Sequence, residues 1–202
     1  MNKVLFLFLS AFIFWFVFIK SDTVVLGPGV MAPQAPLQER ISSAKPFAFK
    51  EYMLTPMANF EIHAKVLSKE DYSYGREADL SPTDLALGWG RMSDESVLGH
   101  LSVSQSSRWY RWETSELPIP RREIEVSSAN MHMIPRDEEV ASALKEVHIG
   151  EIVRLRGKLV SVNASDGWHW VSSLSRTDTG GGACELVYLE EIKIEEVSNR
   201  HD

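Results

Sequence analysis

The sequence predicts a mainly β (α+β) domain, a small β-barrel or sandwich with one or two short helices, preceded by one transmembrane helix. Three observations predict this class: a long apolar run at the N-terminus, segments in which apolar and polar residues alternate, and polar or glycine-containing turns between those segments. The chain has 202 residues, of which 44% are apolar and 24% are charged. These proportions are those of a folded protein.

The N-terminal run extends from Val4 to Ile19, carries no charge and contains Ser10 as its one polar residue. As a helix it would be about 24 Å long, slightly short of a hydrocarbon core of about 30 Å, and Lys20 can reach the interface beyond it. A cleaved signal peptide is the competing interpretation, but residues 19–22 (IKSD) lack the small-residue pattern of a cleavage site. We therefore expect residues 1–20 to be an uncleaved signal anchor.

Charges beside this run set its expected orientation. Lys3 precedes the helix, whereas Lys20 is offset by Asp22 after it. The positive-inside rule then predicts a single-pass protein of the cytoplasmic (inner) membrane, with its C-terminal domain in the periplasm of a bacterium. Residues 21–45 contain three prolines and two glycines, which predicts an extended tether. Residues 46–202 form the expected extracytoplasmic domain.

The first half of this domain contains one strand with clear alternation, Phe60–Leu67. An acidic loop follows, and Ser81-Pro82 then predicts the start of a short helix over 83–87. The remaining predicted elements of this half are a hairpin of 98–105 and 108–113 turned at Ser106-Ser107, and a short extended piece over 123–126.

The second half is more regular. Asp137 is a good N-cap for a helix that ends near Glu146. The predicted strands are 151–162, 168–174 and 184–197, separated by a turn at 163–167 and a glycine-rich loop at 179–182. The strand GEIVRLRGKLVSV resembles those of OB-fold domains, in which a Gly-acid-x-V-x-L-x-G-x-L pattern recurs. The resemblance covers residues 137–197 and implies an OB-like closed β-barrel.

Charge and cysteine content exclude several functions. Without Lys3 and Lys20, 19 basic and 28 acidic residues leave a net charge of about −9, which disfavours nucleic-acid binding. The single cysteine, Cys184, excludes an intrachain disulfide and a thiolate metal cluster. No catalytic signature surrounds Cys184 or the six histidines, so the sequence predicts no enzyme and no cofactor.

One candidate metal site consists of Met92, Met131, His132 and Met133, because thioethers and imidazole suit Cu(I). The stretch GWGRM that ends at Met92 resembles the Trp-x-x-Met element of small periplasmic copper-binding β-barrels of the CusF type. The chain departs from that pattern, since Asp94 stands where the family has a further methionine and the nearest upstream histidine is distant. Alternatively, Met131 and Met133 point inward as core residues, with His132 on the other face of a strand.

Two further groups of residues are candidate partner surfaces. In the second arm of the hairpin, Trp109 and Trp112 fall on opposite faces, so one face is expected to be buried. Arg154, Arg156 and Lys158 form a basic row on the outward face of 151–162, where they either pair with acids such as Glu190 and Glu191 or meet an anionic ligand.

The sequence therefore predicts a membrane-anchored extracytoplasmic binding or assembly domain with a protein partner in the cell envelope. The alternative is a periplasmic small-ligand or Cu(I)-binding β-barrel. A hydrolase that uses His132 with Asp137 or Cys184 is a third class, and the spacing of these residues does not support it.

Overall fold

The computed structural model describes residues 23–175 and 183–195. The chain is mainly β, with 46% strand and 16% helix, in a many-stranded, β-barrel-like sheet. The anchor predicted over 1–20 and the glycine-rich loop predicted over 179–182 lie outside the described residues. Within the described ranges, no helix is long and apolar enough to cross a membrane.

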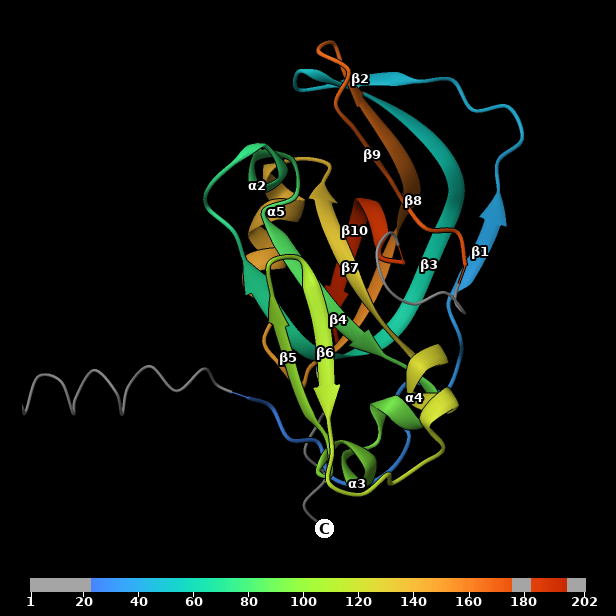
Figure 1. Ribbon diagram of the computed structural model, residues 1–202, viewed down its shortest axis with the longest axis vertical. Coiled ribbons are helices and arrows are strands. Elements are labelled where there is room, and N and C mark those ends of the chain that lie inside the picture. The colour runs from blue at the N-terminus through green and yellow to red at the C-terminus, as the bar shows by residue number, and fades with distance from the viewer. Residues whose placement is uncertain (1–22, 176–182, 196–202) are drawn as a thin grey trace, which may run out of the picture.

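The main sheet contains all the strands except those of one separate hairpin (Figure 1). Its strands are β1 (Leu37–Arg40), β2 (Phe47–Phe49), β3 (Tyr52–Asp71), β4 (Thr83–Gly88), β7 (Ser128–Pro135), β8 (Ile152–Ala164), β9 (His169–Val171) and β10 (Glu185–Ile194). The path β3-β4-β7-β10-β8 closes on itself because β8 also pairs with β3. Every neighbouring pair on this path is antiparallel except β7 and β10, which are parallel.

Alternation along the strands explains the core. In β3 the residues from Ala58 to Val66 that share one face are all buried, as the pattern of Phe60–Leu67 predicts. The predicted helix is also present as α5 (Glu138–Lys145), whose N-cap Asp137 accepts a hydrogen bond from the N–H of Val140 at 3.0 Å. Val140 and Leu144 pack with the barrel interior, so α5 covers part of that core.

The helix predicted over 83–87 is wrong, since these residues belong to β4, which lies between β3 and β7. All six residues of β4 are buried because the insertion after it covers its outer face. A strand buried on both faces loses the polar alternation that identifies strands in sequence. The extended piece predicted over 123–126 is also wrong, because it forms part of the short helix α4 (Arg121–Val126).

The segment expected to be a tether contacts the domain. The N–H of Val24 donates to the carbonyl of Ile149 at 2.8 Å, Ala32 is fully buried, and β1 pairs with β3. The free edge of β3 and the polar groups after β4 supply hydrogen bonds that a proline-containing segment cannot supply to itself. The N–H of Gly29, for example, donates to the Asp94 carboxylate at 2.9 Å.

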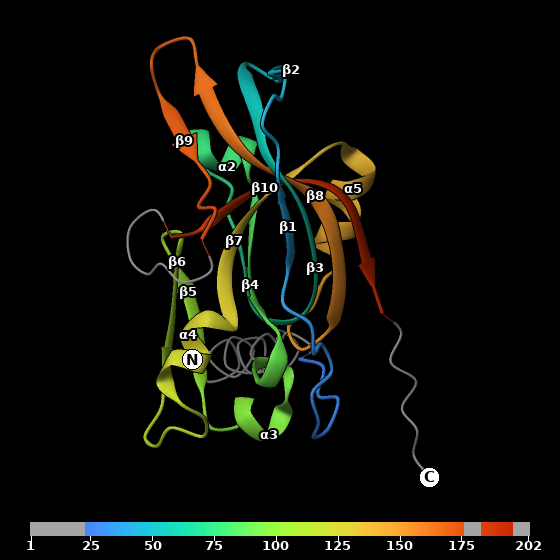
Figure 2. The same cartoon turned by 90° about the vertical axis from the view of Figure 1, so that its right-hand side faces the viewer.

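Between β4 and β7 the chain makes an insertion that lies outside the barrel (Figures 1 and 2). Its elements are η1 (Gly90–Ser93), α3 (Glu95–Leu98), β5 (Ser102–Ser106), β6 (Trp109–Glu113) and α4. The predicted hairpin is present as β5–β6, but its turn is Ser107–Arg108, one residue later than predicted. Both turn residues have positive φ, which is typical of the tight turns that match strand twist. The hairpin lies over the outer face of β4 and β7, and this placement creates the site.

Candidate functional site

A buried polar cluster occupies the outer face of β4 and β7. Asp84 of β4 and His132 of β7 are partners in the strand register and are both buried. Because side chains alternate along a strand, they point away from the barrel core, which contains the neighbouring Met131 and Met133. Nδ1 of His132 lies 2.9 Å from Oδ1 of Asp84.

Arg108, in the turn of the hairpin, completes this cluster. Its Nη1 donates to Oδ1 of Asp84 at 2.6 Å, and its Nη2 donates to the carbonyl of Ser81 at 2.9 Å. The guanidinium also lies 3.7 Å from the ring centroid of Tyr72 and 5.7 Å from that of Trp170. A buried carboxylate requires such a partner, so Asp84 fixes the tip of the hairpin to the barrel.

Neutral side chains attach the rest of the hairpin. Gln105 Nε2 donates to Oδ1 of Asn130 at 2.6 Å, and Nδ2 of Asn130 donates to the carbonyl of Arg108 at 3.0 Å. The hydroxyls of Tyr110 and Ser128 are 2.9 Å apart. Burial raises the pKa of the Tyr110 hydroxyl to about 12, although the hydrogen bond with Ser128 opposes the shift. Tyr110 is therefore neutral at physiological pH and keeps this contact.

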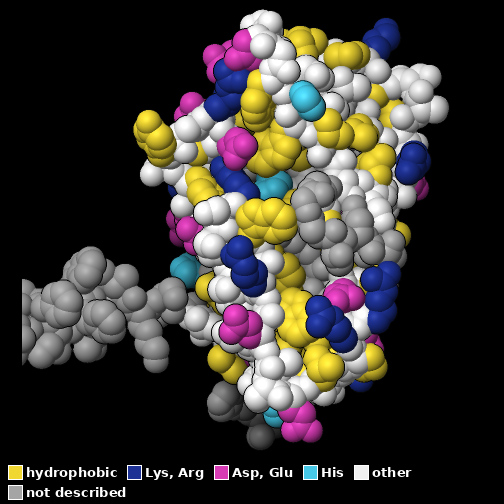
Figure 3. Space-filling view, in the orientation of Figure 1, with side chains coloured by type: hydrophobic (Ala, Val, Ile, Leu, Met, Phe, Trp, Pro, Cys, Tyr) yellow, Lys and Arg dark blue, Asp and Glu magenta, His cyan; other side chains and the backbone are white. Residues whose placement is uncertain are grey.

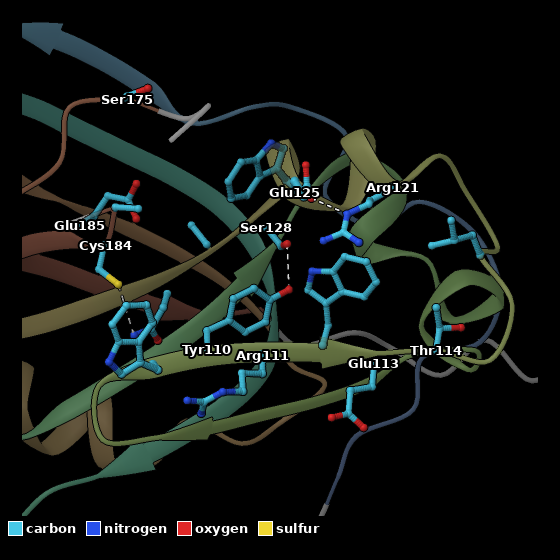
Figure 4. A pocket seen from close by; sticks show the side chains of 17 residues that line it. Tyr110, Arg111, Glu113, Thr114, Arg121, Glu125, Ser128, Ser175, Cys184 and Glu185 are labelled. Atoms are coloured by element: carbon cyan, nitrogen blue, oxygen red, sulfur yellow. Dashed lines mark hydrogen bonds and ion pairs between the residues drawn. The ribbon is translucent and has the colours of Figure 1, made fainter. Parts of the chain in front are cut away.

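Beside the attached hairpin lies a groove of about 900 Å³, which we call the hairpin groove. Three runs of consecutive residues line much of it: 109–114 along β6, Ser128–Asn130 at the start of β7, and 183–185 where β10 begins. In Figure 4 the side chain of Tyr110 points into the groove toward Ser128, whereas those of Arg111 and Glu113 point away from it. The main chain of Arg111 and Glu113 therefore borders the groove.

The groove has an aromatic lining with charges at its margin. Its aromatic residues are Trp89, Trp109, Tyr110 and Trp112. Trp109 is 45% exposed, and the Arg121 guanidinium lies 5.5 Å from the ring centroid of Trp112. Arg121 also donates to Glu125 at 2.8 Å, across the wall formed by α4. On this face of the molecule, hydrophobic side chains form a band between scattered acidic and basic ones (Figure 3).

The structure does not bring the candidate copper ligands together. Met131 and Met133 are buried in the barrel core, Met92 is buried in the core of the insertion, and His132 faces Asp84 on the other side of the sheet. Across residues 23–175 and 183–195, no group of three His, Cys, Asp or Glu side chains is arranged to hold a metal ion.

The two candidate partner surfaces have different positions. Trp109 and Trp112 both line the hairpin groove, with Trp112 partly buried against the core of the insertion. The basic row is on β8, where its members form ion pairs with acidic residues of and beside β10, one of the two arrangements expected for it. These pairs are Arg154–Glu195 at 2.6 Å, Arg156–Glu191 at 2.8 Å and Lys158–Glu190 at 2.8 Å.

Sequence reasoning missed the two charges that position the hairpin. Asp84 and Arg108 are 24 residues apart in the chain and belong to no motif. A usable signal was present, because Asp84 is the only charged residue in TDLALG, the sequence of β4. A lone acid in a buried strand requires a basic partner.

Comparisons of the chain with protein-family models, curated proteins and solved structures find no match.

Proposed function

We propose that the chain is a membrane-anchored, extracytoplasmic binding domain that holds a protein partner in the hairpin groove. The N-terminal apolar run supports the anchor, and its flanking charges support the orientation. The barrel is OB-like in this proposal. When β3, β4, β7, β8 and β10 are numbered 1 to 5 in chain order, their order around the barrel is 1-2-3-5-4. A helix, α5, lies between the third and fourth, which is consistent with a small Greek-key barrel.

The observation that carries the proposal is the lining of the groove. Three tryptophans and a tyrosine line it, beside the side chain of Arg121. Tyr, Trp and Arg are the residues that most often dominate binding energy at protein interfaces. Trp109 has almost half of its surface exposed next to this wall, as an interface anchor would.

Rigidity supports the same conclusion. The hairpin that forms one wall is fixed at its tip by the buried Arg108–Asp84 pair and farther along by Tyr110 and Ser128. A wall that is already ordered loses little conformational entropy when a partner binds. The alternative of a Cu(I)-binding barrel has no comparable support, because its methionines pack in two separate cores.

Site-specific photocrosslinking in native membranes tests the proposal. A benzophenone amino acid replaces Trp109 in the groove or, as a matched control, Glu39 on the exposed face of β1. We expect one defined protein adduct from position 109 and none from position 39. A second variant, Leu117→Ala at the margin of the groove, should weaken the adduct without unfolding the chain, because Leu117 is 49% exposed. Equal labelling from positions 109 and 39 would refute the proposal.

A further inference from the structure

We infer that the partner enters the hairpin groove as an extended peptide segment and adds a third strand to the free edge of β6. The inference rests on the proposed function and specifies how the partner is recognised. Strand addition obtains affinity from main-chain hydrogen bonds and specificity from every second side chain.

The strand β6 has a partner on one side. It pairs with β5 in a two-stranded sheet, and no other described strand pairs with it. An edge strand presents unpaired N–H and C=O groups, which makes it a template for another strand. Two-stranded hairpins are also marginal alone, and a third strand stabilises them.

The register identifies the groups at this edge. The two-residue turn closes on the pair Ser106 and Trp109, which in such a turn exchange hydrogen bonds. Hydrogen-bonded and non-hydrogen-bonded pairs then alternate along the hairpin, so the N–H and C=O groups of Arg111 point toward β5, as those of Trp109 do. The N–H and C=O groups of Tyr110 and Trp112 consequently point away from β5, toward the free edge.

The hairpin groove lies along that edge. Successive side chains of a strand point to opposite faces, so a hollow over one face would contact every second residue. The hairpin groove instead contacts all six residues from 109 to 114. Because the Arg111 and Glu113 side chains point away (Figure 4), the groove follows the strand edge and not one face of the strand.

The opposite wall of the groove is also bordered by the main chain of a strand. Ser128, Ala129 and Asn130 are consecutive residues of β7 that also line the groove. Their partner on one side is β4, whereas the pairing of β7 with β10 begins only at Met131. Main chain therefore borders the groove on two sides, which suits an extended peptide better than a compact ligand.

The side chains of the hairpin define the chemistry of the segment. Residues of the added strand that face the barrel would lie beside the rings of Tyr110 and Trp112, so apolar residues are expected at alternate positions. Residues of the other face would lie beside Arg111 and Glu113, which are exposed and of opposite charge. The expected segment therefore alternates apolar residues with charged ones.

Peptide selection tests this mode of binding. A phage-displayed library of random dodecapeptides is panned against the full-length chain in non-ionic detergent, and the selected peptide is synthesised with each amide N-methylated in turn. We expect methylation to weaken binding about tenfold at every second residue and to have little effect between, since each effective site loses one hydrogen bond. In amide exchange measured by NMR, Tyr110 and Trp112 should gain protection while Trp109 and Arg111, which already bond β5, should change little.

The same selected peptide provides the control and the results that would contradict the inference. N-methylation changes only the peptide, so a folding defect of the protein cannot mimic the result. Uniform tolerance of N-methylation, helical spacing of the sensitive positions, or a library without a binder that protects Tyr110 and Trp112 would overturn strand addition. The crosslink from position 109 in membranes would still stand in each case, so failure of this mode is distinguishable from failure of the proposed function.

Discussion

Removal of either member of the buried Arg108–Asp84 pair should destabilise the protein strongly. Asp84 is fully buried, and the Arg108 side chain is only 14% exposed. Removing one partner of a buried ion pair costs about 3–5 kcal/mol because the other charge loses its principal partner. Asp84→Leu and Arg108→Met should each lower the free energy of unfolding by that amount.

The double variant distinguishes a buried charge pair from two independent contacts. When both charges are replaced by apolar groups, no uncompensated charge remains, so Asp84→Leu with Arg108→Met should be less destabilising than the sum of the single changes. We expect a coupling energy of about 2 kcal/mol. Arg111→Met, on the exposed face of the same hairpin, is the matched control and should change stability by less than about 0.5 kcal/mol.

Urea unfolding of the full-length chain in non-ionic detergent, followed by tryptophan fluorescence, measures these changes. Trp170, one of the six tryptophans that contribute to this signal, lies 5.7 Å from the Arg108 guanidinium. Single variants within about 1 kcal/mol of the unchanged protein, or strictly additive effects in the double variant, would refute a buried pair that fixes the hairpin.

Three further changes test other parts of the fold. Gly157→Ala would place a Cβ 2.1 Å from the Tyr188 carbonyl oxygen, so urea unfolding should show a loss of about 1–3 kcal/mol, and an unchanged midpoint would contradict this close approach. The pKa of Tyr110 in the folded protein is about 12, above its ordinary value of 10, so the neutral hydroxyl stabilises the fold fully below pH 10, and this contribution is lost as the pH rises to 12. The variant Tyr110→Phe should reduce this loss of stability at alkaline pH, measured by urea unfolding across that range. Hydrogen bonds from the N–H of Val140 and, next in size, from Arg136 lower the pKa of Asp137 below 3.8, so the stability that its carboxylate contributes is lost as the pH falls through that lowered value. The variant Asp137→Asn, which still caps α5, should make acid unfolding less steep.

Local patterns predicted the elements whose surroundings are ordinary. The strand β8 is buried on one face and exposed on the other, so Val153 and Leu155 alternate with Arg154 and Arg156. The helix α5 has its cap residue, Asp137, directly before it. These features depend on residues that are close in the chain, and such features are visible without any knowledge of tertiary contacts.

The prediction for the residues of β4 was wrong for the opposite reason. Its sequence, TDLALG, is short and almost continuously apolar, and such a run does not distinguish a strand from a helix. Only the insertion, which packs over Ala86 from outside, explains why the second face is apolar as well. The Ser-Pro pair before it resembles a helix start, and tertiary packing overrides that local preference.

Only a small part of the candidate site was predictable from local sequence patterns. Alternation in WYRWE placed Trp109 and Trp112 on opposite faces of the strand, because this pattern is local, but it did not say which face is packed. Nothing local links Arg108 to Asp84, since the contact exists only after the hairpin folds back over β4. The groove is a consequence of that fold-back, and a sequence pattern does not record it.

A free strand edge also invites pairing between two copies of the chain, and the charges along β6 argue against that outcome. If two β6 strands paired antiparallel about their centre, Arg111 would face its own copy, and like charges directly opposite each other are destabilising. The net charge of −7 adds repulsion between whole molecules. A different segment avoids the first cost when it places an acidic residue opposite Arg111. The edge is therefore better suited to a heterologous strand than to a second copy, as the proposed strand addition requires.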